Sequence, residues 1–578
     1  MIDSLRKLIA VCLAAGMLLP GCKQPSDGPE TPSAPAAPEG LTVRGTTETS
    51  VTVQWNPVEG ASSYEWKVAL GSETAASGSV TKRNVTAEGL KPGTAYTFSV
   101  RSMGSGASSD FSSIGFTTTG SSQPDVPAAD AVCVDAPLVL KLDSAPVLGS
   151  SGCIKVFTSE GKEVDRIDLA DLSGVSIRED GCMIPKAALG KESKFNTFMD
   201  AMRSGKRYRV EHYTPLRVKG NKLEIKLHNN VLDFGCSYYV TVDQSVAGKA
   251  VEKGEWTFTT KAKPAGPVYS VLQDGSGDFC TVQGALTHVS SLDKNAEATV
   301  EVGKGTFNEM LFLREKNNLT IKGASAEGAV ISYPNNESYC SGSGASATSL
   351  PSRGGEVGVP GGRGLFLAES CDNLTIENLT IENSFGEQKG QAETIYFNSS
   401  GKMVIESCRL LSWQDTFLTK GKVWVHNSLI AGHVDFIWGY PEACLFENCE
   451  IRSRAGGYIV QARIESASSK GFVFLNCKLT AESGVKDGSM YLARSGGDSS
   501  KYDNVTYIGC TMSPVIAAAG WYTSPAPTPS KPTATSGWKE YGSVDPNGKP
   551  VTGHNSYGLV LSAEEAAQYS SRQAVLGW

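Results

Sequence analysis

Alternating apolar and polar positions dominate the N-terminal half of the chain. From about residue 40 to 119, short alternating runs are separated by Gly, Pro and Asn, and the same pattern returns between 128 and 262. Successive side chains of a strand point to opposite faces, so this alternation predicts antiparallel sheets with one buried face. We therefore expect two β-sandwich domains, over residues 40–119 and 128–262.

The pattern changes at residue 268. Short β-rich runs now repeat one template, as in VIESCRLLS (404–412), VWVHNSLIAG (423–432) and CLFENCEIRS (444–453). One position of the template is always small, and its members are Cys408, Ser428, Cys449, Cys477 and Cys510, at steps of 20, 21, 28 and 33 residues. Strand repeats of this length without amphipathic helices predict a parallel β-helix over 268–578, with loops of variable length on one side.

The repeat also explains the cysteines. Equivalent positions on successive coils stack about 4.8 Å apart and point inward, where a small apolar thiol fits. Fourteen Cys in an exported protein would otherwise suggest disulfides, but this spacing favours stacked free thiols. There is no CxxC pair or Cys/His cluster, and the chain has only six His, so we expect neither a metal nor another cofactor.

The N-terminus resembles an export signal. Arg6 and Lys7 precede an apolar run that ends in LPGC, which is similar to a bacterial lipobox apart from Pro20. We expect residues 1–22 to be a lipoprotein-type signal peptide, with Cys22 as the lipidated residue; an ordinary secretory peptide is the alternative. Residues 23–39, rich in Pro, Ser and Ala, then form a tether. The expected location is outside the cytoplasm, lipid-anchored to a bacterial outer membrane on its periplasmic or cell-surface face.

Length and charge narrow the function classes. A chain of 578 residues is too long for one ordinary core. The formal net charge of −7 argues against nucleic acid as a partner. We expect a monomer.

Two aspartates lie in apolar surroundings twenty residues apart, in LSWQDTFL (411–418) and HVDFIWG (433–439). Twenty residues is one repeat, so Asp415 and Asp435 should be neighbours on adjacent coils. Two close carboxyl groups do not ionise equally, which suits a nucleophile or base beside a general acid. The alternative is that each Asp only caps a turn.

The residues around this pair suggest acyl transfer. Gln391 and Gln414 are one coil apart and offer neutral donors to an oxyanion, while Arg494 can pair with a carboxylate. Three tryptophans in the same region are candidates for stacking on sugar rings or for packing in the core, namely Trp413, Trp438 and Trp521.

Ordered motifs identify the families that the chain resembles. VLQDGSGDFCTVQGAL (271–286), VGKGTFNE (302–309), GQAETIYF, WQDTFL, HVDFIWG, YLAR and AAGWYTS (518–524) follow one another as in pectin methylesterases, over nearly all of 268–578. The run LKPGTAYTFSVR and the closing FTT resemble a fibronectin type III module within 40–119. Residues 128–262 look like a bacterial Ig-like sandwich.

The resemblance implies an all-β fold, with a C-terminal right-handed parallel β-helix preceded by two β-sandwich domains. It implies hydrolysis of C6 methyl esters of homogalacturonan (pectin), releasing methanol without a metal. On that analogy Asp435 is the nucleophile and Asp415 the general acid and base. Gln391 and Gln414 would stabilise the oxyanion, and Arg494 would orient Asp435.

Three departures from the family pattern affect substrate contacts. The usual Arg-Pro-Trp is Arg494 to Gly497 (RSGG), Leu418 replaces a tyrosine, and Trp438 stands where Phe is common. The Gly/Ser-rich insert 338–364 is expected to be a long loop.

Three other functions fit a β-helix. A polygalacturonase-like hydrolase also uses paired Asp, although the two Gln would have no task there. A pectate lyase needs a Ca²⁺-binding acidic cluster, which the sequence does not show. A non-catalytic surface pectin-binding protein would not need the Asp, Gln and Arg set.

Overall fold

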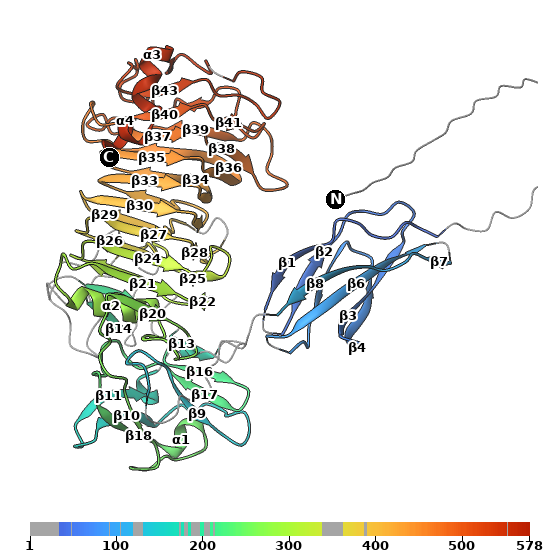
Figure 1. The fold of residues 1–578 in the computed structure, drawn as a ribbon, viewed down its shortest axis with the longest axis vertical. Coiled ribbons are helices and arrows are strands. Elements are labelled where there is room, and N and C mark those ends of the chain that lie inside the picture. The colour runs from blue at the N-terminus through green and yellow to red at the C-terminus, as the bar shows by residue number, and fades with distance from the viewer. Residues whose placement is uncertain are drawn as a thin grey trace, which may run out of the picture. The chain divides into compact units, whose positions relative to one another are not determined.

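The computed structural model describes most of the chain (Figure 1). The described residues are 34–118, 131–337 and 362–578, except Glu48, Pro92, Ser105, 173–174, 178–182, 186–196, 201–207, 212–213, 387–389 and Thr552. The predicted signal peptide with Cys22, most of the tether and most of the 338–364 insert therefore lie outside the described residues. The chain divides into two compact units, residues 1–121 and 122–578. No helix in the described ranges is long and apolar enough to span a membrane.

The first unit is an antiparallel β-sandwich. One sheet contains β1 (Thr42–Thr46), β2 (Val51–Gln54) and β5 (Asn84–Ala87). The other contains β3 (Ser63–Leu70), β4 (Glu73–Val80), β6 (Ala95–Gly104), β7 (Ala107–Ser108) and β8 (Ser112–Thr117). Trp55, Tyr64 and Phe98 pack between the sheets, with the Trp55 and Tyr64 rings 5.2 Å apart. The inward positions of the alternating runs thus form the core, as the pattern predicts.

Residues 131–262 begin the second unit with further antiparallel strands. One sheet has the order β11 (Glu163–Asp168), β10 (Cys153–Thr158), β18 (Ser237–Val242), β19 (Thr257–Thr259), and another β16 (Leu216–Lys219), β17 (Lys222–Ile225), β9 (Leu138–Lys141). Two hairpins pair β12 (Val175–Ile177) with β13 (Met183–Pro185) and β14 (Thr197–Asp200) with β15 (Tyr208–Glu211). The short helices are η1 (Leu169–Leu172) and α1 (Gln244–Ala247). Ile154, Leu223 and Val240 belong to one buried cluster that joins the two larger sheets.

The remaining strands form a right-handed parallel β-helix. Its first sheet contains β20 (Val268–Val271), β21 (Ala298–Val302), β24 (Leu319–Gly323), β27 (Leu374–Glu377), β30 (Lys402–Glu406), β33 (Lys422–His426), β35 (Ala443–Glu447), β37 (Gly471–Leu475), β40 (Val505–Ile508), β43 (Trp538–Tyr541) and β44 (Gly558–Val560). These strands stack in chain order along the solenoid in Figure 1. Every strand pair in this sheet is parallel, because each coil adds one strand in the same direction.

The second sheet of the β-helix folds around its other sides. One run contains β22 (Gly305–Phe307), β25 (Ala329–Tyr333), β28 (Thr380–Asn383), β31 (Arg409–Leu411), β38 (Lys478–Ala481) and β41 (Thr511–Met512). The other contains β23 (Leu311–Arg314), β26 (Phe366–Glu369), β29 (Ile395–Asn398), β32 (Phe417–Thr419), β39 (Met490–Arg494) and β42 (Trp521–Tyr522). The long strands β34 (Leu429–Gly439) and β36 (Glu450–Ala462) pair with members of both runs. In these two neighbouring coils, one continuous strand therefore connects the two runs of the sheet.

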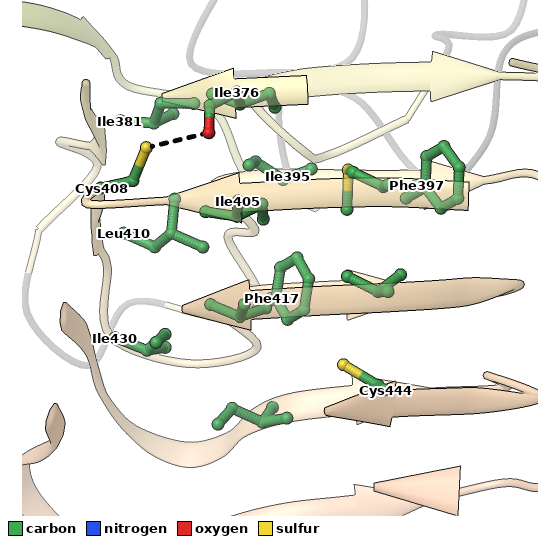
Figure 2. Close-up of a cluster of buried hydrophobic side chains, with 14 of the residues drawn as sticks. Ile376, Ile381, Ile395, Phe397, Ile405, Cys408, Leu410, Phe417, Ile430 and Cys444 are labelled. Atoms are coloured by element: carbon green, nitrogen blue, oxygen red, sulfur yellow. Dashed lines mark hydrogen bonds between the residues drawn. The ribbon is translucent and has the colours of Figure 1, made fainter. Parts of the chain in front are cut away.

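The repeated small residues lie at one turn of each coil. Before them stand Ser407, Asn427, Asn448 and Asn476, all with φ between +48° and +54°. Asn tolerates this left-handed conformation better than most residues, which turns the chain and points the next side chain inward. The following cysteines are buried free thiols, so the predicted stack is confirmed. Figure 2 shows Cys408 in the core with its Sγ bonded to the Ile376 carbonyl of the preceding coil.

Helices cover surfaces of the solenoid that would otherwise expose apolar residues. The helix α2 (Val282–Ser291) begins at Thr281, whose hydroxyl caps it, and buries Leu286 and Val289 against the first coils. At the other end lie α3 (Ala563–Ala566), η3 (Ala567–Tyr569) and α4 (Arg572–Leu576). They cover outward-facing residues of β35 and β37, such as Leu445 and Val473.

Candidate active site

The strand register places the two aspartates on adjacent coils. Leu411 pairs with Ala431 and Phe417 pairs with Ile437, so both flanks are offset by twenty residues. Between these flanks the backbone N–H of Asp415 donates to the Val434 carbonyl at 3.0 Å. The structure thus brings Asp415 and Asp435 to equivalent places on neighbouring coils, as the repeat predicts.

Both aspartates interrupt regular strand geometry. Asp415 has φ +64° and Asp435 has φ +48°, and each is nearly buried. Left-handed backbone is uncommon outside glycine, although Asp and Asn adopt it more readily than other residues. Two positions after each aspartate the chain returns to the apolar core, at Phe417 and Ile437.

The Asp435 carboxylate is held by cationic and neutral donors. Arg494 donates from Nε to Oδ1 at 2.7 Å and from Nη2 to Oδ2. Gln461 donates from Nε2 to Oδ2 at 2.9 Å. The bond to Asp435 raises the pKa of Arg494, which stays charged. This bidentate pairing fixes the direction of the Asp435 carboxyl group.

Asp415 has a different environment. Burial raises the pKa of its carboxyl well above the usual range, and the charges of Glu393 and Asp435 add to that rise. Arg363, which donates from Nη2 to Oδ2 at 3.1 Å, and Arg463 oppose it. Asp415 therefore keeps its proton to higher pH than an exposed aspartate, as a general acid must.

The two glutamines also lie together. Gln391 and Gln414 form a parallel bridge on adjacent coils, as expected. The Gln391 Oε1 accepts from Arg363 Nη1 at 2.8 Å, which leaves its Nε2 as the free donor end. Among the described residues the Gln414 amide makes no side-chain hydrogen bond, so it can donate to a ligand.

Sequence reasoning missed several residues of this site. Gln461 contacts Asp435, while Arg363 contacts both Asp415 and Glu393. Glu393 had a detectable signal, because it lies two positions after Gln391 and a strand repeats its face every second residue. Arg363 had none, since it closes the Gly-rich insert, where no periodicity predicts a position.

The predicted tryptophans have different environments. Trp521 is 1% exposed and stacks on Trp538 at 5.2 Å, so the prediction that it lines a sugar-binding wall is wrong: as the last coils close, its ring lies inside the core. Trp438 is nearly buried between Arg363 and Arg463, whose Cζ atoms lie 5.4 and 5.0 Å from its ring. Trp413 is half-buried, with Arg454 4.2 Å from its ring centre.

Three tyrosines form an aromatic surface beside Arg494. Tyr458, Tyr491 and Tyr522 come from three successive coils, and their ring centres lie 4.9 to 5.9 Å apart. All three are half-buried. The Arg494 Cζ is 5.1 Å from the Tyr458 ring, so this tyrosine cluster adjoins the residue that holds Asp435.

One group in the described part of the chain has metal-type spacing. Possible ligand atoms of Cys133, Asp135 and Cys280 lie within 4.8 Å of one another, where residues 131–262 meet the β-helix. The Asp135 oxygens already accept from the backbone N–H groups of Cys280 and Thr281. The Lys261 ammonium, which donates to the Gly277 carbonyl beside the Cys133 thiol, repels a divalent cation. These contacts join the two domains and do not suit a metal.

Similarity to known proteins covers two regions of the chain. The pectinesterase family model matches residues 269–577, and the fibronectin type III model matches residues 36–117. Pectinesterase 31 of Arabidopsis thaliana is 34% identical over 256 residues, which are 44% of this chain and 75% of the relative. Pectinesterase A of Emericella nidulans is 28% identical over 282 residues, 48% and 81% of the two chains.

Among solved structures, a pectin methylesterase from Erwinia chrysanthemi aligns with a TM-score of 0.42 and 22% identity over 55% of this chain and 98% of that one. The family model covers more than half of the chain, and Pectinesterase 31 is matched over three quarters of its length. The chain therefore belongs to the pectinesterase family, and it is a carboxylic ester hydrolase with an N-terminal fibronectin type III domain.

Proposed function

We propose that the β-helix hydrolyses C6 methyl esters of galacturonate residues in homogalacturonan, releasing methanol and leaving a carboxylate on the polymer. The observation that carries the proposal is the unequal state of two adjacent aspartates. Asp435 is paired with Arg494, whereas burial raises the pKa of Asp415 well above its usual range. An ionised nucleophile beside a protonated acid is what cleavage of an ester requires.

The first half-reaction forms an acyl-enzyme. An oxygen of Asp435 attacks the ester carbonyl carbon, and the carbonyl oxygen becomes an oxyanion. The Nε2 groups of Gln391 and Gln414 donate hydrogen bonds to that oxygen. Asp415 gives its proton to the methoxy oxygen as the carbon–oxygen bond breaks, so methanol leaves and an anhydride with Asp435 remains.

The second half-reaction restores the enzyme. Asp415, now a carboxylate, takes a proton from water, and the resulting hydroxide attacks the galacturonate carbonyl carbon of the anhydride. Asp435 leaves as a carboxylate, and Arg494 is already placed to pair with it. The net reaction consumes one ester and one water and gives one methanol and one carboxylic acid.

Aromatic side chains beside the site are suited to bind the polymer. The chain lacks the tryptophan that pectin methylesterases carry after the arginine at position 494. Tyr458, Tyr491 and Tyr522 present half-exposed rings next to Arg494 and can stack on sugar faces instead. Trp413 remains a candidate for stacking on sugar rings. Trp438 is nearly buried, and its ring contacts Arg363 and Arg463.

Product analysis tests the proposal. Purified protein and highly methylated pectin should give methanol in step with new carboxylates, without new reducing ends. Reducing ends without methanol would favour the polygalacturonase-like alternative. Unsaturated uronate would indicate a lyase, and pectin binding without any product would indicate a surface binding protein.

We further propose that the mature protein is monomeric and is lipid-anchored through Cys22 at the outer membrane. The support is the LPGC run followed by a Pro/Ser-rich tether. Metabolic labelling with a radioactive fatty acid should mark the wild type and not the C22S variant. Sedimentation of the protein without its lipid anchor should give one chain per particle. A dimer would contradict the monomer, and an unlabelled wild type would contradict the lipid anchor.

A further inference from the structure

The guanidinium of Arg363 connects four side chains of the site. Its Nε donates to Glu393 at 2.7 Å, its Nη1 to Gln391 at 2.8 Å and to Glu337 at 2.9 Å, and its Nη2 to Asp415 at 3.1 Å. Arg363 is 7% exposed and Glu393 is fully buried. A rigid guanidinium fork can hold this many acceptors at fixed angles, which an ammonium cannot.

Arg363 sets the orientation of Gln391. The amide oxygen of Gln391 is occupied by Arg363, so its NH₂ end must point the other way. Arg463 orients Gln461 in the same way. Its Nε donates to Gln461 Oε1 at 2.9 Å, while Gln461 Nε2 donates to Asp435. In both cases an arginine makes one end of an amide an obligatory donor toward the reaction centre.

Arg363 carries one positive charge and contacts three carboxyl groups. Glu393 and Glu337 lie closer to Arg363 than Asp415 does, and either carboxylate, when ionised, balances the positive charge of Arg363. Burial raises the pKa of Glu393, and Arg363 opposes that rise. Once Glu393 is ionised, the charge of Arg363 is balanced, and Asp415 retains its proton although an arginine touches it.

We propose that Arg363 and Glu393 are positioning residues of this enzyme: Arg363 aims the Gln391 amide at the substrate, and Glu393 offsets the positive charge that Arg363 brings to Asp415. The inference rests on the proposed function. Arg363 and Glu393 act through Gln391 and Asp415 and take no part in bond making.

Other charged groups around Asp415 are accounted for. Asp435 on the next coil raises its pKa, and Arg463 lowers it. Arg494 interacts electrostatically with Asp415 but is paired with Asp435. Asp435, Arg463 and Arg494 are unchanged in variants of Arg363 or Glu393. A shift of the Asp415 pKa in such a variant therefore reports on the Arg363–Glu393 pair.

The test is the pH profile of kcat/KM for methanol release, whose alkaline limb reports the loss of the Asp415 proton. In R363Q the cation is lost, and the limb should move up by about one to two pH units. In E393Q the charge of Arg363 is released toward Asp415, and the limb should move down by about one unit. The double variant R363Q/E393Q should return close to the wild-type limb.

The orientation of Gln391 has its own readout. R363Q should lower kcat by about 10- to 100-fold with little change in KM, because an oxyanion donor acts mainly in the transition state. R363K keeps the charge and loses the fork, so its limb should stay near that of the wild type while kcat falls. If Arg363 only stabilised the fold, R363Q and R363K would not separate the fall in kcat from the shift of the alkaline limb.

Matched controls come from a more exposed ion pair of the β-helix. Arg452 and Glu450 of β36 contact each other at 2.9 Å and are about one third exposed. R452Q and E450Q should leave kcat and the limb unchanged. Thermal unfolding of each variant checks folding; should R363Q not fold, E393Q and the double variant still decide the sign.

Shifts of R363Q and E393Q in the same direction, or no shift in either, would overturn the inference while leaving the proposed function standing. If the wild type releases no methanol, the proposed function itself fails. The two failures are therefore distinguishable.

Discussion

The backbone N–H of Asp415 donates to the carbonyl of Val434, the residue that precedes Asp435 on the next coil. This hydrogen bond links adjacent coils at the two acids, and both residues have left-handed backbone. The coil spacing of the β-helix, about 4.8 Å, sets the separation of the pair. Their different partners give the two carboxyl groups unequal environments.

Removing either carboxylate should abolish turnover without unfolding the protein. In D435N and D415N we expect methanol release to fall at least about 10³-fold, because the nucleophile or the proton donor is lost. Asn adopts left-handed backbone as readily as Asp, so thermal unfolding should stay near that of the wild type. Unchanged rates in both variants would refute the site.

Arg494 should matter for turnover more than for substrate affinity. R494Q loses the bidentate contact to Asp435, and kcat should fall by about 100-fold at constant KM. R494K keeps the charge without the fork and should recover part of that loss. A rise of KM alone in R494Q would show that Arg494 binds the polymer and does not orient Asp435.

The tyrosine cluster should contribute to polymer binding. Y522A should raise KM for pectin by about 3- to 10-fold with a small effect on kcat, since a stacked ring contributes about 0.5–1.5 kcal/mol. Y522F is the matched control, because it keeps the ring and should bind like the wild type. Equal KM values for all three proteins would exclude Tyr522 from the groove.

Lys539 should make stability depend on pH. Burial lowers the pKa of this fully buried lysine to about 7, and Lys470 adds to that fall. Between pH 7 and about 10.4 the unfolded chain binds the proton and the native chain does not, so this group favours the native state increasingly as pH rises and loses that contribution as pH falls. The stability of K539M minus that of the wild type should therefore be greater at pH 6.5 than at pH 9.5, by about 3 kcal/mol. A pH-independent difference in urea unfolding would contradict the assignment.

The cysteine stack should behave as core packing. Cys477 is fully buried and its Sγ bonds to the Phe446 carbonyl of the previous coil. C477A should lower the free energy of unfolding by about 1 kcal/mol, because it leaves a small cavity. C153A, at a half-exposed thiol, is the control and should change stability little. Thiol reagents should modify Cys477 only after unfolding.

Repetition made much of the fold readable from the sequence. The steps between Cys408, Ser428 and Cys449 set the coil length, and the structure pairs β30, β33 and β35 in the same order. Alternation with a period of two likewise predicted the antiparallel strands around Trp55. These signals are local, because a coil or a hairpin imposes its own period on its residues.

Long-range contacts were not readable in this way. Arg363 reaches Asp415 across 52 residues and Gln461 reaches Asp435 across 26, with no repeat linking them. Trp521 lies in an apolar run that fits a groove wall as well as a core, and only the closing coils decide that it stacks on Trp538.

The all-β class, the coil length and the adjacency of Asp415 and Asp435 could be predicted from the sequence, because residues one repeat apart in a solenoid become neighbours in space. The folded structure, by contrast, makes the environments of the two acids unequal and raises the pKa of Asp415. That difference depends on burial and on the arginines and glutamates brought in from other coils, and electrostatic interactions follow distance in space, not distance along the chain.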